Sequence, residues 1–448
     1  MAVSLRKFYI ELYQEYLEEA SFLYEQRLTL LDDPEITWLD IEDFEGRFEP
    51  HIDGLVIGDA LALDVCRQQG EEGDFGELHA AVRVFCRQKR WDLIQGVLEG
   101  LDFEDEERVT AVIDALSQEL PQEWEPRILE MLTEEDTGRI RIAAHVIGFR
   151  RMPVGPELTT VLDRDNSETI SAVIWALGRL RETDAAPGLF KVMDSDHDAF
   201  NPATALSLLR LGEIQILKDC MNHIEKEDWP ILPIGLGGGY AEAETLRRIA
   251  SNRSSPDILM AIALLGGIDG VDILMDALVD TELADFAAIA LNLLTGAELY
   301  QDVFIPEEMD EDELFDEEKD KISKGEHLFP EGEEPGTTLT LPCRDTEMWA
   351  RWWMENQSRF QRSIRYRNGK PYSPLCLLDN LKFEKSPRLI RQLAYEELVI
   401  RYDMNSAFET EMAVFEQKRS ISGIEGWIEA NGRRFTEGKW YFAGRIIT

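Results

Sequence analysis

Three aspartates in the middle of the chain have the spacing that begins a calcium-binding loop. Asp194, Asp196 and Asp198 would occupy its first, third and fifth positions, which supply oxygen ligands to Ca²⁺. The sixth position is Ala199, where the turn of such a loop requires glycine, and the twelfth is Ala205, where it requires glutamate. The pattern is incomplete, and we predict no metal site. Aspartates between repeated helices more often cap the next helix and line one edge of the array.

A glycine-rich segment at 235–239 is a second candidate, because backbone N–H groups ahead of a helix can hold a phosphate. No Lys and Ser/Thr pair follows it, and Pro230 and Pro233 interrupt the strand that should precede a phosphate-binding loop. The five cysteines form no CxxC pair, and the six histidines form no HExxH or His/Cys cluster. We expect a turn between helices at 235–239, reduced cysteines in the core, and no cofactor.

The elements that carry these residues form a repeat. Five apolar, alanine-containing segments each close on glycine, and a turn and a second apolar segment follow. They are AAHVIG (143–148), AVIWALG (172–178), ALSLLRLG (205–212), AIALLGG (261–267) and AIALNLLTG (288–296). Gly148 and Gly178 are 30 positions apart, as are Gly266 and Gly296, which suits a pair of short helices per unit.

Helical spacing within one unit predicts the architecture. Ile170, Val173 and Leu177 recur on one face of a helix that we expect to end at Gly178, and Pro187 opens the second helix. One such pair cannot bury its apolar side alone, whereas stacked pairs can, and alanines let neighbouring helices approach. The sequence therefore predicts an all-α protein with an α-solenoid of HEAT-like repeats over residues 75–296.

Three further regions complete the predicted organisation. Residues 1–74 begin with a long amphipathic helix and form a helical N-terminal cap, which a repeat array needs to cover its end. Residues 297–337 contain EEMDEDELFDEEKDK (307–321) and are an acidic linker or loop. Residues 338–448 form a mainly helical C-terminal region. Its Trp349, Trp352 and Trp353 are either a stacking platform or a core anchor, and we favour the core anchor.

Composition points to an acidic protein that binds other proteins. The chain has 88 acidic and 46 basic residues, a net charge of −42 and a pI near 4.5. Such a charge repels phosphate backbones, so we predict no nucleic-acid partner and expect a basic protein partner. The bland alternative is that the acidic residues only keep the surface soluble. No signal peptide or membrane-spanning segment is expected, so we place the chain in the cytoplasm without a membrane partner.

The order of several motifs resembles a bacterial family of HEAT-repeat proteins associated with type VI secretion gene clusters. The motifs are EEASFLYEQR (18–27), HIDGL (51–55), the central repeats, MWARWWMENQSRF (348–360) and RYRNGKPY (365–372). The acidic insert at 307–334 is longer and more charged than the family pattern, and the tail after Ser420 does not match it. The resemblance implies no catalytic motif, and it implies association with secreted effectors or spike-loading proteins.

Our leading hypothesis is a non-catalytic, protein-binding solenoid whose concave face and acidic loop hold a basic protein. The resemblance implies a partner that is a type VI effector or a spike-associated protein, with this chain acting as an immunity protein or as an adaptor or chaperone. The candidate partner-binding residues are Asp165, Asp196, Asp198, Asp228 and Trp229, which stand between predicted repeats.

Two alternatives remain open. Some helical-repeat proteins are enzymes, such as DNA glycosylases and bilin lyases, but the former need a basic groove, and no nucleophile, base and orienting group converge in this sequence. The other alternative is a purely structural scaffold of the secretion machine. Association that is insensitive to salt, with spike or sheath components, would favour that scaffold.

Overall fold

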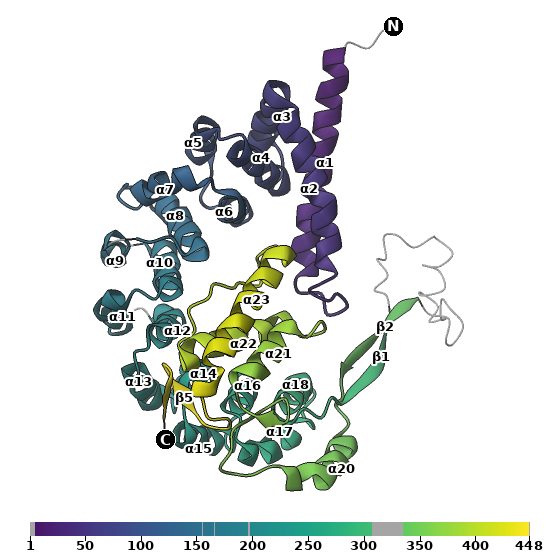
Figure 1. Cartoon of the computed structure of the whole chain (residues 1–448), viewed down its shortest axis with the longest axis vertical. Helices are drawn as coiled ribbons and strands as arrows, with labels where there is room; N and C mark the ends of the chain where they lie inside the picture. The colour runs from purple at the N-terminus through teal and green to yellow at the C-terminus, as the bar shows by residue number, and fades with distance from the viewer. Residues whose placement is uncertain (1–4, 155, 165, 196–197, 307–334, 448) are drawn as a thin grey trace, which may run out of the picture. The chain divides into compact units, whose positions relative to one another are not determined.

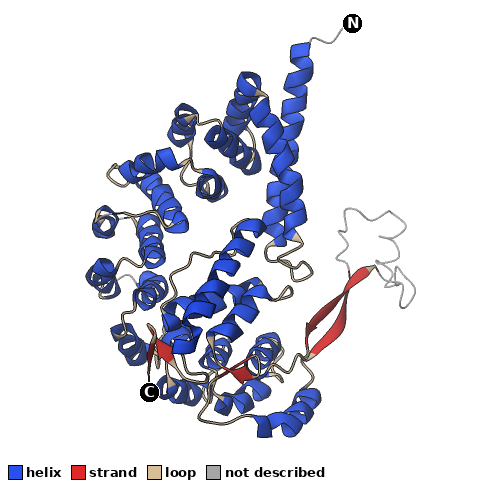
Figure 2. Ribbon diagram, viewed as in Figure 1, coloured by secondary structure: helices blue, strands red, loops and turns tan. Residues whose placement is uncertain are grey.

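The computed structural model of the chain describes residues 5–154, 156–164, 166–195, 198–306 and 335–447. This part of the chain is mostly α-helical, with three small two-stranded sheets (Figure 2), which confirms the prediction of a mainly helical protein. Contacts divide the chain into two compact units: unit 1 is 1–249 together with 372–448, and unit 2 is 250–371. These units differ from the domains expected from the sequence, which kept 338–448 together.

Unit 1 begins with fifteen α-helices among its described residues. They are α1 (Leu5–Leu30), α2 (Ile41–Ile57), α3 (Asp59–Glu72), α4 (Phe75–Arg87), α5 (Trp91–Gly100), α6 (Glu106–Glu119), α7 (Glu125–Met131), α8 (Thr137–Arg150), α9 (Glu157–Thr160), α10 (Ser167–Leu180), α11 (Ala186–Met193), α12 (Asn201–Leu211), α13 (Gln215–His223), α14 (Ile231–Gly237) and α15 (Tyr240–Ala250), whose last residue belongs to unit 2. The last part of unit 1 adds α21 (Pro374–Lys382), α22 (Arg388–Tyr402), α23 (Val414–Asn431), the 3₁₀ helix η7 (Gly432–Arg434), β5 (Tyr441–Phe442) and β6 (Arg445–Ile446).

Every second helix from α4 to α14 contacts the next helix of that series, and the helices between them form a second row (Figure 1). Alanines on the contacting faces, such as Ala111, Ala143 and Ala172, are 1% exposed or less. Since a small side chain allows close backbone approach, these positions set the spacing between the helices, as the sequence predicted. No helix among the described residues has the length and apolar character that crossing a bilayer requires.

The repeated glycine has two different roles, and the sequence identified only one. Gly212, like the glycines that end two helices of unit 2, adopts a left-handed conformation and caps its helix as expected. The prediction that Gly178 ends its helix is wrong, because α10 continues to Leu180 and Arg181 takes the left-handed position. A Cβ on Gly178 would lie 2.8 Å from the Cβ of Ser207, so this glycine is needed for close packing of α10 against α12.

The C-terminal segment of unit 1 folds onto the helical array of the same unit. α22 contacts α12 and α14, and α23 contacts α2, as Figure 1 shows. A buried cluster that includes Tyr372, Leu381, Leu398 and Phe408 holds α21, α22 and the following loop together. Trp38, in the connection between α1 and α2, packs against this cluster, so the two ends of the sequence contact each other there.

Unit 2 contains α16 (Pro256–Leu265), α17 (Val271–Ala277), α18 (Ala284–Thr295), β1 (Tyr300–Pro306), β2 (Gly336–Pro342), α20 (Thr346–Asn356), the 3₁₀ helix η6 (Gln357–Arg359), β3 (Tyr366–Arg367) and β4 (Lys370–Pro371). Trp349 is 1% exposed and its indole N–H donates to the carbonyl of Cys343 at 2.7 Å, so it is a core anchor. Strands β1 and β2 pair antiparallel and flank the acidic run. The run at 307–321 lies outside the described residues.

Two segments 75 positions apart have the same local structure. The second segment belongs to the tail after Ser420, which does not match the family pattern. The corresponding pairs are Trp352 and Trp427, Asn356 and Asn431, Arg359 and Arg434, Phe360 and Phe435, Tyr366 and Tyr441, and Gly369 and Gly444. In both copies the asparagine amide donates to the tryptophan carbonyl, at 2.8 and 2.9 Å, and the tyrosine hydroxyl accepts a backbone N–H, at 2.8 and 2.7 Å.

Each copy ends in a tight hairpin that docks on the C-terminus of a helix. The two turn residues have positive φ, at Asn368 and Gly369 in the first copy and at 443–444 in the second. The N–H groups of the first turn donate to the carbonyls of residues 293 and 294 in α18, and those of the second turn to residues 400 and 401 in α22. The hairpins thereby satisfy carbonyls that a helix end leaves without an intrahelical partner.

Candidate binding surface

The structure describes three of the five predicted partner-binding residues. Asp198 is exposed in the turn before α12, and Asp228 is exposed in the loop before α14. Trp229 is half-buried, its indole N–H donates to Glu227, and its ring lies 5.7 Å from the ring of His223. Asp165 and Asp196 lie outside the described residues. The described three thus occupy two loops, one before α12 and one before α14.

Acidic side chains also stand at the start of the preceding helices of this series. Asp105 accepts from the N–H of Arg108 in α6, and Asp136 accepts from the N–H of Arg139 in α8, so these aspartates are helix caps. We use the name acidic edge for the carboxylates at the N-terminal ends of α6, α8, α10, α12 and α14: Asp105, Glu106, Asp136, Glu168, Asp198 and Asp228.

One arginine holds part of the acidic edge together. The Arg141 guanidinium in α8 donates to Glu106 of α6 at 2.8 Å and to Glu168 of α10 at 3.1 Å. These contacts show that the first turns of three successive helices lie side by side. The pair partners Glu106 and Glu168 are more than half exposed, so solvent screens these ion pairs and their contribution to stability is small.

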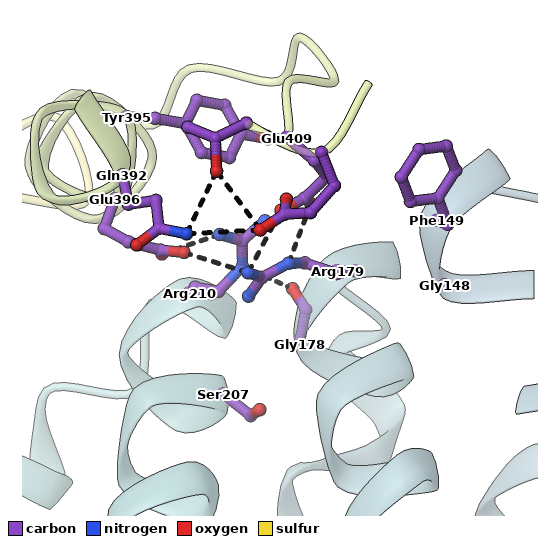
Figure 3. Close-up of polar contacts among 12 residues, drawn as sticks. Gly148, Phe149, Gly178, Arg179, Ser207, Arg210, Gln392, Tyr395, Glu396 and Glu409 are labelled. Atoms are coloured by element: carbon purple, nitrogen blue, oxygen red, sulfur yellow. Dashed lines mark hydrogen bonds and ion pairs between the residues drawn. The ribbon is translucent and has the colours of Figure 1, made fainter. Parts of the chain in front are cut away.

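The opposite, C-terminal ends of the same helices carry arginines that bind the C-terminal segment (Figure 3). Arg179 donates through Nε to Glu409 at 2.9 Å, and its Nη2 lies 3.3 Å from a carboxylate oxygen of Glu396. Arg151 donates to Glu409 at 2.6 Å, and Arg210 donates to Glu396 at 2.6 Å. Three helices of the array, α8, α10 and α12, therefore bind two carboxylates from α22 and the loop after it. We call these five residues the arginine–glutamate network.

The surroundings of the network favour its charged form. Burial alone would raise the pKa of Glu409, but the guanidiniums of Arg179, Arg151 and Arg210 outweigh burial and lower that pKa. Arg210 also donates through Nε to the carbonyl of Gly178 at 2.9 Å, and its guanidinium lies 5.4 Å from the centre of the Tyr395 ring. Buried ions that are paired and hydrogen-bonded in this way fix the geometry of the contact.

More contacts attach the same segment to both ends of the array. Arg181 pairs with Asp403 and donates to the carbonyl of Met404 at 3.4 Å. Near the N-terminus, Arg27 of α1 donates to the carbonyl of residue 411 at 2.9 Å, and Arg388 of α22 pairs with Asp32 at 2.9 Å. The C-terminal segment of unit 1 therefore covers the C-terminal ends of α8, α10 and α12. Sequence reasoning had not excluded a partner from this face.

In the described part of the chain, more cationic than anionic side chains are buried. Its buried charged side chains are seven arginines and four glutamates: Arg27, Arg83, Arg210, Arg365, Arg367, Arg391, Arg401, Glu77, Glu396, Glu397 and Glu409. The remaining residues therefore carry a charge more negative than the −42 of the whole chain. The surface is more acidic than composition alone indicates.

Sequence reasoning missed the network, although part of its signal is present. An arginine lies at or just after the end of each helix, at 150–151, 179–181 and 210, and Glu396 and Glu397 interrupt an apolar run of α22. Charges at positions where helical spacing predicts burial indicate buried pairing. In the described ranges, no three His, Cys, Asp or Glu side chains come together as a metal site requires.

Comparison with known proteins adds no relative. No model of a known protein family matches the chain, and no curated protein matches it. The function is therefore proposed from the charge distribution described above, and the kind of partner from the family resemblance.

Proposed function

We propose that this chain is a non-catalytic protein-binding scaffold, in which α4 to α14 belong to a HEAT-like solenoid and the acidic edge binds a basic protein. The distribution of charge is the observation that carries this proposal. The interior takes up arginines while the carboxylates of the acidic edge stay at the ends and loops of the array. A surface with an excess of one charge attracts a partner of opposite charge and orients its approach.

The acidic edge is favoured over the opposite end of the helices because that end is covered. Arg210 lies in the last turn of α12 and binds α22, whereas Asp198 lies just before the first turn of the same helix. A partner that approaches the Asp198 end meets loops and carboxylates of the array rather than the chain's own C-terminal segment. Asp228 and Trp229 extend this surface.

The family resemblance supplies the partner in this proposal. A type VI effector with a basic toxin domain, or a basic spike-associated protein, would bind the acidic edge in the cytoplasm. The chain would then act as an immunity protein that holds a toxin inactive, or as an adaptor that delivers it. A nuclease toxin is the clearest example of such chemistry, since a surface that binds phosphate is basic and complements carboxylates.

Affinity measured against candidate effector and spike proteins, at low and moderate salt, tests the proposal. The double variant Asp198→Lys with Asp228→Lys changes two charges of the acidic edge. Asp64→Lys with Glu99→Lys makes the same change in net charge at exposed positions of α3 and α5. Because two attractions become repulsions, we expect the first variant to weaken binding by about tenfold, an effect of about 1.4 kcal/mol, and the second by less than about threefold.

Three results bear on the alternatives. Salt-sensitive binding that only the acidic-edge variant weakens supports the proposal, and co-expression with a toxin then shows whether toxicity is relieved. Equal weakening by both variants would mean that net charge alone acts and that the acidic edge is not the site. Tight association with spike or sheath components that neither salt nor the variants change would replace the proposal with a structural scaffold.

A further inference from the structure

A cavity of about 280 Å³ lies in unit 1, between α1, α2, α4, α6 and the segment at 413–416. Aromatic rings form much of its wall: Tyr24, Phe44, Phe48 and Phe415. Phe415 is 64% exposed, which places it at the opening, whereas Tyr24 and Phe48 are buried. The cavity is distinct from the acidic edge and from the arginine–glutamate network.

Two polar groups of the cavity wall have no hydrogen-bond partner among the described residues. His79 is 1% exposed and neither of its ring nitrogens is paired, and the Nε of Arg83, one helical turn further along α4, is also unpaired. The His79 ring stacks on Tyr24 with centroids 3.7 Å apart and an interplanar angle of 7°. Because a buried donor or acceptor without a partner is costly, these atoms indicate a missing ligand group.

The rest of the Arg83 guanidinium is already engaged, which restricts what can bind. Its Nη2 donates to Glu49 at 2.8 Å and to Glu119 at 2.5 Å. Burial, and then the charges of Arg83 and Arg27, lower the pKa of His79 well below its usual range, so its ring is neutral near pH 7. A neutral imidazole offers one donor and one acceptor, and the Arg83 Nε–H offers one donor.

The charges of the lining exclude two classes of ligand. Three arginines and five glutamates line the cavity: Arg27, Arg83, Arg87, Glu42, Glu45, Glu49, Glu119 and Glu416. An anion would enter a site that already holds an excess of carboxylates. A cation such as an ammonium group has no acceptor for the Arg83 Nε–H. A neutral hydroxyl can accept a hydrogen bond from Arg83 and also pair with His79. An aromatic ring on the ligand would pack against the aromatic wall of the cavity.

We propose that this cavity binds a neutral phenol, with the ring between Tyr24, Phe48 and Phe415 and the hydroxyl paired with His79 and the Nε–H of Arg83. The volume is large enough for a single ring with a short substituent. The phenol is either a free small molecule or the side chain of a tyrosine on another protein. The chemistry recognised is the same in both cases, and the source is decided by the test.

Binding of p-cresol and of toluene to the full chain, measured by calorimetry or ligand-observed NMR, tests the proposal. The two ligands share a methyl-substituted ring and differ in the hydroxyl. We expect p-cresol to bind about tenfold more tightly than toluene, the effect of one or two net hydrogen bonds. We expect p-toluate, the corresponding carboxylate, to bind more weakly than p-cresol. A p-cresol affinity no higher than that of toluene, or preference for p-toluate, would overturn the proposal.

A variant links the preference to the named residue. His79→Phe keeps a ring stacked on Tyr24 and removes both nitrogens, so the preference for p-cresol should fall from about tenfold to about threefold, the part that the Arg83 Nε–H still supplies, while folding is retained. His145→Phe is the matched control, because His145 is a partly buried histidine of α8 that packs 5.4 Å from Trp175 outside the cavity. An undiminished preference of about tenfold in His79→Phe would refute the assignment.

Two further arms complete the design. Phe415→Ala removes an exposed ring at the opening of the cavity, so it should weaken the binding of p-cresol and of toluene equally and leave the ratio of their affinities unchanged. If the affinity for both ligands stays the same, they bind elsewhere and the proposal fails. N-acetyl-tyrosinamide, compared with N-acetyl-phenylalaninamide, separates the two sources. A tenfold preference for the tyrosine derivative assigns the cavity to a protein side chain, and binding of p-cresol without it assigns a free small phenol.

Discussion

Glu409→Gln tests whether the arginine–glutamate network fixes the C-terminal segment to the array. Glu409 is 7% exposed and accepts from Arg151 at 2.6 Å and from Arg179 at 2.9 Å. Glutamine has nearly the same shape, so packing is preserved while the negative charge is lost. Its one carbonyl oxygen can still accept, but its NH₂ group faces a second guanidinium, and the guanidiniums of Arg179 and Arg210 then share one carboxylate, that of Glu396.

The size of the effect follows from the burial of the pair. Removing one partner of a buried ion pair costs about 3–5 kcal/mol, and the remaining carbonyl of glutamine favours the lower end, about 3 kcal/mol. If the loop at 403–413 opens without global unfolding, its opening free energy falls by that amount. Because about 1.4 kcal/mol is a factor of ten, the amide protons of this loop should exchange about 100-fold faster.

Hydrogen–deuterium exchange measures this directly. The N–H of Met404 donates to the backbone carbonyl of Leu398 at 3.2 Å, and that of Met412 donates to the backbone carbonyl of Glu409 at 3.3 Å. Both amides therefore report on the loop. The control is Asp163→Asn, which breaks an exposed pair with Lys191 and should change exchange by less than about fivefold. If exchange in Glu409→Gln stays within fivefold of the wild type, the network does not hold the segment in place.

Acid should act in the same direction as the substitution. The pKa of Glu409 is lowered in the folded chain, so the network stabilises the fold at pH values above the unfolded pKa of about 4.3. That stabilisation is lost as the pH falls through the folded pKa. Faster exchange of the loop amides below pH 4, absent from Glu409→Gln, is the expected signature.

Two other predictions concern single positions in each unit. Burial raises the pKa of Asp114 from 3.8 to about 6, so its carboxyl destabilises unit 1 once ionised, and stability falls as the pH rises from about 4 to about 6. Asp114→Asn should therefore match the wild type near pH 3 and exceed it by about 2 kcal/mol at pH 8 in denaturant titrations, after allowance for partial exposure; equal stability at pH 8 would contradict this. In unit 2, Gly369→Ala should lower the melting temperature, because Gly369 has φ +69° and its Cβ would lie 2.4 Å from the Thr295 carbonyl oxygen. Gly426 lies within α23 and its added Cβ would meet open space, so Gly426→Ala should instead stabilise the folded chain by about 0.5–1 kcal/mol. Equal melting temperatures for Gly369→Ala and Gly426→Ala would refute the conformational reasoning.

Local patterns predicted the helices, because helical spacing and caps are encoded within a few residues. Ile170, Val173 and Leu177 share a buried face of α10 as expected, since each is 9% exposed or less. The end of that helix was not predictable in the same way. Arg181 takes a left-handed conformation that costs a non-glycine residue about 1–2 kcal/mol, and a tertiary contact, its Nε donating to the carbonyl of Arg210 at 2.9 Å, offsets the cost. Helix propensity contains no information on a contact to another helix.

The candidate site shows the same limit on a larger scale. Asp198 and Asp228 could be placed on loops from sequence alone, because they stand between apolar segments. The arginine–glutamate network could not, since it joins residues 151–210 to residues 396–409 across about two hundred positions of intervening chain. Neither periodicity nor charge count specifies which arginine meets which glutamate. Only the folded chain shows that the C-terminal ends of α8, α10 and α12 are covered, which leaves the other end of these helices as the proposed binding surface.

The repeated motif explains why the tail after Ser420 belongs to the fold of unit 1. Its turn at 443–444 donates to the carbonyls at 400 and 401, and the carbonyl of Tyr441 accepts from the fully buried guanidinium of Arg401 at 3.2 Å. Without this hairpin, the last turn of α22 would keep buried carbonyls and a buried cation with fewer partners, a costly arrangement. The copy at 352–371 closes the end of α18 in unit 2 in the same way, because the N–H of Asn368 donates to the carbonyl of Leu293 at 2.7 Å. The tyrosine and the glycine shared by the two copies belong to these hairpins, so closing a helix end accounts for the recurrence of this part of the motif 75 positions later.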